Sequence, residues 1–204
     1  MSIILVRHGE TPLNVARVLQ PPSTGLSERG MAQARAVARR LAERKPAAIL
    51  SSDLPRAALT AQAIAQASGL PVESTELLHE RNFGDLRGKP YDALGFDAIT
   101  MEDAPPGGES MPVFHARVDR ALELVTRLRA GLTGDLIVVT HGLVIRSLLN
   151  RRLRLPEGVP PPERIGNTSI TVVTPTEPFV VSLLDCVAHL DAETGEDGRS
   201  LSGG

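Results

Sequence analysis

The sequence predicts an α/β protein, a three-layer α/β/α sandwich built on a mainly parallel sheet. Uninterrupted apolar runs at residues 3–6, 47–50 and 136–139 are typical of strands buried on both faces. Helical patterns lie between these runs, in the order strand–helix–strand–helix and then helix–strand–helix. Such an alternation favours a parallel sheet that is covered by helices on both sides.

The first half of the chain supplies two strand–helix units. Residues 3–6 form the first expected strand. After a polar loop, Ser27 is a residue type that caps helices, and the helix that it begins ends before Pro46. Residues 47–50 form the second strand, and the alanine-rich helix that follows it ends at Gly69.

The second half begins with a long helix, capped by Ser110 and ended by Gly131. Residues 136–139 form the third buried strand and run directly into a further helix. Residues 170–173 and 179–183 have the composition of two late strands, which we expect to pair near one edge of the sheet.

Length and composition are those of one globular domain. The chain has 204 residues, of which 42% are hydrophobic and 23% charged, and residues 1–185 are expected to form a single domain. From Cys186 onward the sequence is rich in Asp, Glu, Gly and Ser. Residues 186–204 are therefore expected to form a flexible C-terminal tail.

Composition also excludes several classes of protein. A formal charge of −2 and an aromatic content of 2% argue against nucleic-acid binding. No apolar run approaches the roughly 20 residues of a membrane span, so no membrane partner is expected. The single cysteine allows neither an internal disulfide nor a cysteine zinc site. The N-terminus does not have the pattern of a secretory signal, so a cytoplasmic location is expected.

The three buried strands end at residues that suit an anion. Arg7 and His8 follow the first strand, Arg56 lies shortly after the second, and His141 follows the third. Ligands of open α/β sheets bind outside the carboxyl ends of the strands, and parallel strands bring those ends to one edge. We therefore expect these four side chains to meet at one rim.

Two guanidinium groups and two imidazoles around one point favour a phosphate dianion. Planar guanidinium donors match phosphate oxygens in pairs, and the helix N-termini that follow Gly9 and Gly142 add backbone amide donors. A neutral imidazole is also a competent nucleophile toward phosphorus. The rim is therefore expected to be a phosphate pocket that contains a nucleophile.

A metal-hydrolase site is an alternative on residue types alone, since His8, Asp53, Glu80 and His141 could ligate a metal. The two arginines of the rim would repel a dication, however, and no His-x-His or His-Glu-x-x-His spacing occurs. We expect neither a metal nor a cofactor.

The chain also resembles a known family. Residues 5–11, Leu-Val-Arg-His-Gly-Glu-Thr, are similar to the signature of the histidine phosphatase superfamily, whose fold is phosphoglycerate-mutase-like. Further similar blocks follow in the family's order, at residues 26–34, 51–61, 78–88, 106–110, 139–146 and 167–170. The resemblance extends over nearly everything from residue 3 to about residue 184.

The resemblance implies three catalytic residues. His8 would be phosphorylated during turnover. Glu80 would protonate the leaving alkoxide and then accept a proton from the attacking water. His141 would neutralise charge on the phosphoryl group in the transition state.

Other matching positions would support the phosphoryl group. Its oxygens would accept hydrogen bonds from Arg7, Asn14, Arg56 and His141. Behind these donors, Glu10 would orient a contacting side chain, and Gly9 and Gly142 would flank the two histidines.

Departures from the family's pattern favour hydrolysis, and hence its phosphatase branch. Residues 89–110 form a short stretch without the paired arginines that hold a substrate carboxylate in the mutases, and Phe83 stands where mutases have Tyr. We expect a phosphomonoesterase whose partner is a small phosphorylated substrate. Because the loop at residues 20–25 is unusual, the sequence does not identify the natural substrate. It does not identify the oligomeric state either. The alternatives are a phosphoglycerate mutase, a protein phosphohistidine phosphatase and a non-catalytic phospholigand-binding protein on the same fold.

The other histidines and a late basic cluster are expected to lie outside the site. The histidines are His79, which has no partner visible in the sequence, His115 and His189. The cluster, Arg146, Arg151, Arg152 and Arg154, is expected to be a solvated helix end, with an anionic substrate rim as the alternative.

Overall fold

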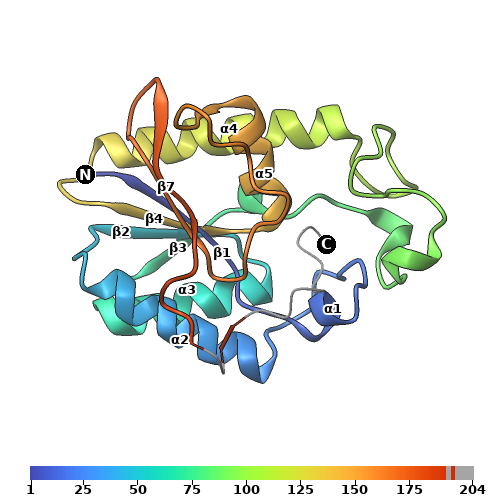
Figure 1. Ribbon diagram of the computed structural model, residues 1–204, viewed down its shortest axis with the longest axis horizontal. Helices are drawn as coiled ribbons and strands as arrows, with labels where there is room; N and C mark the ends of the chain where they lie inside the picture. The colour runs from blue at the N-terminus through green and yellow to red at the C-terminus, as the bar shows by residue number, and fades with distance from the viewer. Residues whose placement is uncertain (192–193, 196–204) are drawn as a thin grey trace.

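A mixed sheet of seven strands lies at the centre of the molecule (Figure 1). The computed structural model describes residues 1–191 and 194–195. The strand order is β3-β2-β4-β1-β6-β7-β5. The strands are β1 (Ile3–Arg7), β2 (Ala48–Ser51), β3 (Val72–Ser74), β4 (Leu136–Thr140), β5 (Leu153–Arg154), β6 (Ile170–Val173) and β7 (Phe179–Cys186). The predicted α/β class is confirmed.

The four strands that come before β6 in the strand order, from β3 to β1, are parallel. β3 pairs parallel with β2, β2 with β4, and β4 with β1. β6 then pairs antiparallel with β1, and β7 antiparallel with β6, so the two late strands pair with each other as predicted. β3 and β5, which the sequence does not predict, have only three and two residues, too few to show a period.

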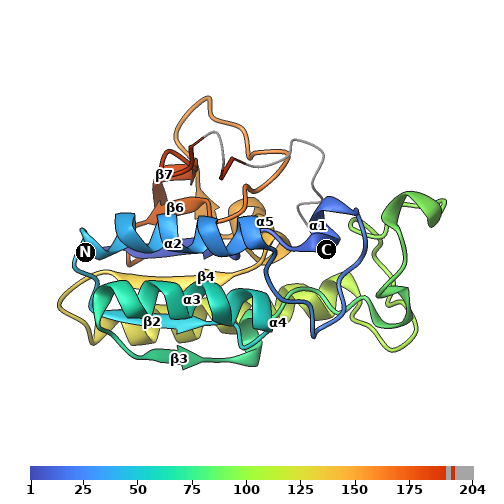
Figure 2. The same cartoon turned by 90° about the horizontal axis from the view of Figure 1, so that it is seen from below.

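Helices cover both faces of the sheet (Figure 2). α2 (Glu28–Ala42) and α3 (Pro55–Ser68) pack on one face, and α4 (Met111–Ala130) and α5 (Gly142–Arg151) pack on the other. The short α1 (Pro12–Val15) follows β1. Among the helices of the described residues, none has the length and apolar character needed to cross a membrane.

Strand residues alternate between two hydrophobic cores, because successive side chains of a strand point to opposite faces. In β1, Ile3 and Leu5 belong to the core that contains α4 and α5. Ile4 and Val6 belong to the core under α2 and α3. None of the four is more than 3% exposed. Burial on both faces is the reason why the central strands have uninterrupted apolar sequences.

The chain between β3 and α4 contains no long helix or strand. It includes three 3-10 turns, Glu76–Leu78, Gly84–Leu86 and Tyr91–Ala93. In Figures 1 and 2 this green segment extends to the right, beyond the carboxyl ends of β1 and β4. It therefore forms one side of the edge at which the rim residues were predicted to meet.

The segment after β7 begins in contact with the domain. Cys186, where the sequence predicts that the tail begins, is the last residue of β7, and its Sγ accepts two hydrogen bonds of 3.3 Å from Arg40. Nε2 of His189 lies 3.1 Å from Oγ1 of Thr168. Residues 192–193 and 196–204 of the predicted tail lie outside the described residues.

Gly30 allows the loop after β1 to lie directly on the first turn of α2. A Cβ at Gly30 would be 2.0 Å from the carbonyl oxygen of Glu10, and one at Gly9 would be 2.6 Å from the carbonyl oxygen of Gly30. The contact is between backbones, so no flexible side chain can move aside. The position of the loop that carries His8 and Gly9 thus depends on a glycine in another element.

We expect Gly30→Ala to lower the free energy of unfolding by about 1–3 kcal/mol, because the added methyl group must displace the backbone of Glu10. Chemical denaturation monitored by circular dichroism measures this change in the free energy of unfolding. Gly131→Ala is the control: its Cβ would meet nothing closer than the Leu128 carbonyl oxygen at 3.6 Å, so the change should stay within about 0.5 kcal/mol. Equal losses in the two variants would contradict the proposed contact.

Candidate active site

The parallel strands bring the predicted rim residues to one edge of the sheet. Arg7 of β1 lies opposite Thr140 of β4 in the strand register, and Ser51 of β2 lies opposite Val139. The residues that follow these positions are therefore adjacent. The ring centroids of His8 and His141 are 5.1 Å apart, with an angle of 58° between the ring planes.

His8 presents Nε2 as its unprotonated nitrogen. Its Nδ1 lies 2.7 Å from the carbonyl oxygen of Gly9, which can only accept a hydrogen bond, so Nδ1 carries the proton. The ring is 1% exposed. Burial, and then the charges of Arg7 and Arg56, hold the pKa of His8 well below its usual value. The imidazole is therefore neutral at pH 7, with a lone pair on Nε2.

His141 is the second buried imidazole. Its Nε2 lies 2.9 Å from Oγ of Ser52, whereas its Nδ1 is buried and has no hydrogen-bond partner among the described residues. Burial and the neighbouring charge of Arg56 lower the pKa of His141 well below its usual value. A buried nitrogen without a partner carries a desolvation cost that a ligand atom could offset.

The two arginines of the rim are buried as well. Arg7 is 1% exposed and donates from Nη1 to the carbonyl oxygen of Ile165. Arg56 is 2% exposed, and within the described part of the chain its Nε and Nη1 find no hydrogen-bond partner. Burial lowers the pKa of Arg56 to about 10, so the group is still charged at pH 7. A buried guanidinium with unpaired donors is suited to bind an oxyanion.

Asn167 contacts both the backbone of His8 and the side chain of Asn14. Oδ1 of Asn14 accepts a hydrogen bond of 3.2 Å from the Thr11 amide, which closes the capping box of α1. Nδ2 of Asn167 donates to the carbonyl oxygen of His8 at 3.0 Å. The same Nδ2 lies 3.5 Å from Oδ1 of Asn14, so Asn14 lies near His8. Asn167 and Ser52 are contacts that we did not single out, although both lie in blocks that resemble the family.

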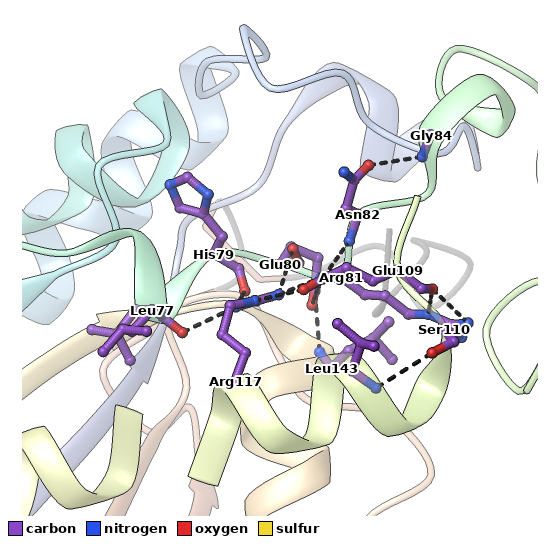
Figure 3. A network of polar contacts seen from close by, with 12 residues as sticks. Leu77, His79, Glu80, Arg81, Asn82, Gly84, Glu109, Ser110, Arg117 and Leu143 are labelled. Carbon is purple, nitrogen blue, oxygen red and sulfur yellow. Dashed lines mark hydrogen bonds and ion pairs between the residues drawn. The ribbon is translucent and has the colours of Figure 1, made fainter. Parts of the chain in front are cut away.

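Glu80 is a buried carboxyl group at the same edge. Its Oε2 accepts a hydrogen bond of 3.1 Å from the Leu143 amide in the first turn of α5, and its Oε1 accepts one of 3.0 Å from the Arg81 amide (Figure 3). Burial raises the pKa of Glu80, although these amides and the charges of Arg56 and Arg7 act in the opposite direction. A carboxyl group with a raised pKa can act as a general acid.

Arg117 of α4 holds the loop that carries Glu80 (Figure 3). It donates to the carbonyl oxygens of Leu77 at 3.0 Å, His79 at 2.8 Å and Glu80 at 3.3 Å. Its Nε and Nη2 also donate to the two carboxylate oxygens of Glu109, at 2.8 and 2.7 Å. Sequence reasoning did not find Arg117, because an arginine on a helix has no local signal that identifies its carbonyl partners.

One expectation about a polar residue is wrong, and one partner was not visible in the sequence. The Glu10 carboxylate does not orient a side chain of the rim; it accepts hydrogen bonds from Ser27 and Arg29 at the start of α2, where a negative charge is stabilised by the helix dipole. His79, for which no partner was visible, contacts the Asp53 carboxylate through Nε2. This partner comes from the loop after β2, and only the parallel pairing of β2 with β3 brings the two together.

The remaining predicted positions are two glycines and the late basic cluster. Gly9 and Gly142 directly follow the two histidines in the sequence. In the late basic cluster, Arg151 and Arg152 pair with Asp119 of α4, and Arg146 donates to the carbonyl oxygen of Glu163. Arg151, Arg152 and Arg154 are nevertheless exposed at and just after the end of α5, as expected of a solvated helix end. Within residues 1–191 and 194–195, no three His, Cys, Asp or Glu side chains are grouped as metal ligands.

Comparison with known proteins agrees with this geometry. The sequence profile of the histidine phosphatase superfamily (branch 1) matches residues 3–183. The chain belongs to the histidine phosphatase superfamily. This superfamily member is 36% identical to Phosphoglycerate mutase-like protein 4 of Arabidopsis thaliana, over 95% of this chain and 88% of that protein. It is 34% identical to the probable phosphoglycerate mutase GpmB of Yersinia pestis, over 94% of this chain and 95% of that protein.

Solved structures of the superfamily have the same fold. A mycobacterial glucosyl-3-phosphoglycerate phosphatase, in complex with VO3, is 30% identical with a TM-score of 0.74, over 89% of this chain and 97% of that chain. Bacillus stearothermophilus YhfR is 28% identical with a TM-score of 0.79, over 93% of this chain and 99% of that chain. The resemblance that the motifs indicate is confirmed.

We expect Arg117→Met to lower the free energy of unfolding by about 3 kcal/mol, because it leaves Glu109 and three carbonyl oxygens half-buried without their partner. Combining it with Glu109→Gln should cost less than the sum of the single losses, since no charge is then left unpaired. Urea denaturation of the three variants measures this coupling.

Asp92→Asn is the control. It removes an exposed ion pair with Arg17 at 2.8 Å and should leave the unfolding midpoint nearly unchanged. Strict additivity of the Arg117 and Glu109 losses would show that the two side chains do not act as a pair.

Proposed function

We propose that the protein hydrolyses a small phosphate monoester through a phosphohistidine intermediate on His8. The observation that carries the proposal is the buried, neutral His8 imidazole, which lies beside the His141 ring and close enough to two buried arginines for their charges to lower its pKa beyond the effect of burial. A neutral imidazole is nucleophilic, and its cationic neighbours attract the dianionic ester that it attacks.

In the first step, the lone pair of His8 Nε2 attacks phosphorus, and the bond from phosphorus to the ester oxygen breaks. Glu80 transfers its proton to that oxygen, so the leaving group departs as a neutral alcohol. In the second step, water attacks the phosphohistidine, Glu80 accepts a proton from the water, and inorganic phosphate leaves. Atoms and protons balance over the cycle, which returns His8 and Glu80 to their starting states.

Charge on the phosphoryl oxygens is neutralised by Arg7 and Arg56, while His141 donates a hydrogen bond as a neutral imidazole and Asn14 is an accessory donor. Arg56 has two buried donor atoms available among the described residues, and His141 has Nδ1. Because these donors are already oriented and desolvated, little reorganisation is needed when charge develops in the transition state. We propose that no metal ion takes part.

A phosphoglycerate mutase is the second candidate, because the relatives from Arabidopsis thaliana and Yersinia pestis carry that name. Hydrolysis is supported by the solved relative that is a phosphatase and binds VO3, an oxyanion. The short segment at residues 89–110, which lacks paired arginines, also favours hydrolysis. Incubation with phosphoglycerate isomers decides: released phosphate supports hydrolysis, and interconversion without release supports the mutase.

We expect turnover of a generic aryl phosphate in the presence of EDTA, and a loss of about a thousandfold or more in kcat for His8→Ala. His115→Ala, outside the site, should retain activity. Brief incubation with a labelled ester followed by an alkaline quench should trap label on the protein. Strict metal dependence would contradict the mechanism, and binding of phosphate without any turnover would indicate a phospholigand-binding protein.

We expect a pH dependence that varies with the leaving group. Glu80 must be protonated, so the rate for an alkyl phosphate should fall as pH rises through the raised Glu80 pKa. On the acid side the lowered pKa of His8 keeps the nucleophile neutral well below pH 6.5. The leaving group of an aryl phosphate needs less protonation, so its rate of hydrolysis should fall less at high pH.

The control for this profile is Glu80→Gln, which should slow alkyl esters far more than aryl esters and flatten the basic limb. A loss that is uniform across leaving groups would show that Glu80 is not the acid. Preferential hydrolysis of phosphohistidine peptides without need of Glu80 would instead indicate a protein phosphohistidine phosphatase.

A further inference from the structure

A cleft of about 350 Å³ lies beside Glu80. Its walls come from the loop after β2 at Leu54, from the segment that carries Asn82 and Arg87, and from α4 at Arg117 and Arg120. In the reaction proposed above, Glu80 protonates the oxygen of the leaving group. The part of the substrate beyond that oxygen therefore has room in the cleft that Glu80 itself lines.

The acidic groups around this cleft already have partners or lie at its rim. Both carboxylate oxygens of Glu109 accept hydrogen bonds from Arg117. Asp53, which does not line the cleft, pairs with His79. Glu76 is exposed at the rim. None of these carboxylates lies within ion-pair distance of Arg87 among the described residues.

Arg87 and Arg120 are the cations of the cleft that have no acidic partner in the described part of the protein, and Arg87 is the half-buried one of the two. Its side chain is half-buried, and no hydrogen bond or ion pair joins it to another side chain in the described part of the protein. Partial burial lowers the pKa of Arg87, with the charge of Glu109 acting in the opposite direction. Arg87 is also close enough to Arg56 for its charge to lower the pKa of Arg56. Two neighbouring guanidinium groups with donors available favour an anion between or beside them.

We propose that Arg87 binds a second anionic group of the substrate, carried by the leaving alcohol, in the cleft beside Glu80. The inference rests on the proposed function for the placement of the leaving group. It names a substrate class, phosphate esters whose alcohol bears a carboxylate or a further phosphate. The rival role for Arg87 is a direct contact with the transferred phosphoryl group.

Inert phosphonates test the proposal without any turnover. The probes are 4-carboxybenzylphosphonate and its neutral isostere, 4-carbamoylbenzylphosphonate, measured by isothermal titration calorimetry. We expect the wild-type protein to bind the carboxylate about tenfold more tightly, as a charge-assisted hydrogen bond would give. Arg87→Gln should abolish this preference, because it should weaken the binding of the carboxylate probe and leave the binding of the neutral probe unchanged. Lys89→Gln, which removes an equal charge from an exposed position nearby, should retain it.

The outcomes separate the alternatives. Equal wild-type binding of the two phosphonates would overturn the proposal, as would an equal loss for both in Arg87→Gln, which would assign Arg87 to the phosphoryl group. Turnover of the matching aryl phosphates is measured in parallel and depends on His8. If the aryl phosphates were not hydrolysed but the carboxylate probe were still bound more tightly, the proposed reaction would be rejected and the anion site at Arg87 would be retained.

Discussion

The repulsion among buried cationic groups is the constraint on which the site depends. Arg7 and Arg56 are held beside two imidazoles at the end of a parallel sheet, and burial, together with the charges of these arginines, lowers the pKa of both His8 and His141. The burial and repulsion that keep the nucleophile neutral also destabilise the folded protein. Two hydrophobic cores, one on each face of the sheet, offset that cost. A bound oxyanion would relieve it further.

Glu80 is set apart from this cluster by its environment. It is the buried carboxyl group among cations, yet its pKa is raised, because desolvation outweighs the two amides and the arginines around it. Its position comes from α4 and α5: Leu143 holds the carboxylate, and Arg117 holds the backbone on which it is carried. The nucleophile and the acid are thus supported by different layers of the fold.

The sequence by itself determined the central strands and the rim. β1, β2 and β4 are buried on both faces, so their apolar runs are visible without knowledge of the partners, and parallel strands must place Arg7, His8, Arg56 and His141 at one edge. The family motifs added Glu80 and Asn14. These inferences succeed because each depends on a local pattern or on one rule of sheet geometry.

Only the tertiary structure decided the polar partnerships. The pairs Arg117–Glu109 and His79–Asp53, and the contact of Glu10 with Ser27 instead of the rim, join elements distant in sequence or depend on side-chain direction. The hydrogen bond to the Gly9 carbonyl oxygen decided which nitrogen of His8 is unprotonated, and burial decided why Glu80 can hold a proton. The packing of the segment between β3 and α4 left Arg87 without an acidic partner among the described residues. Hydrogen bonds and desolvation depend on positions in space to within an ångström, and no pattern along the chain encodes these.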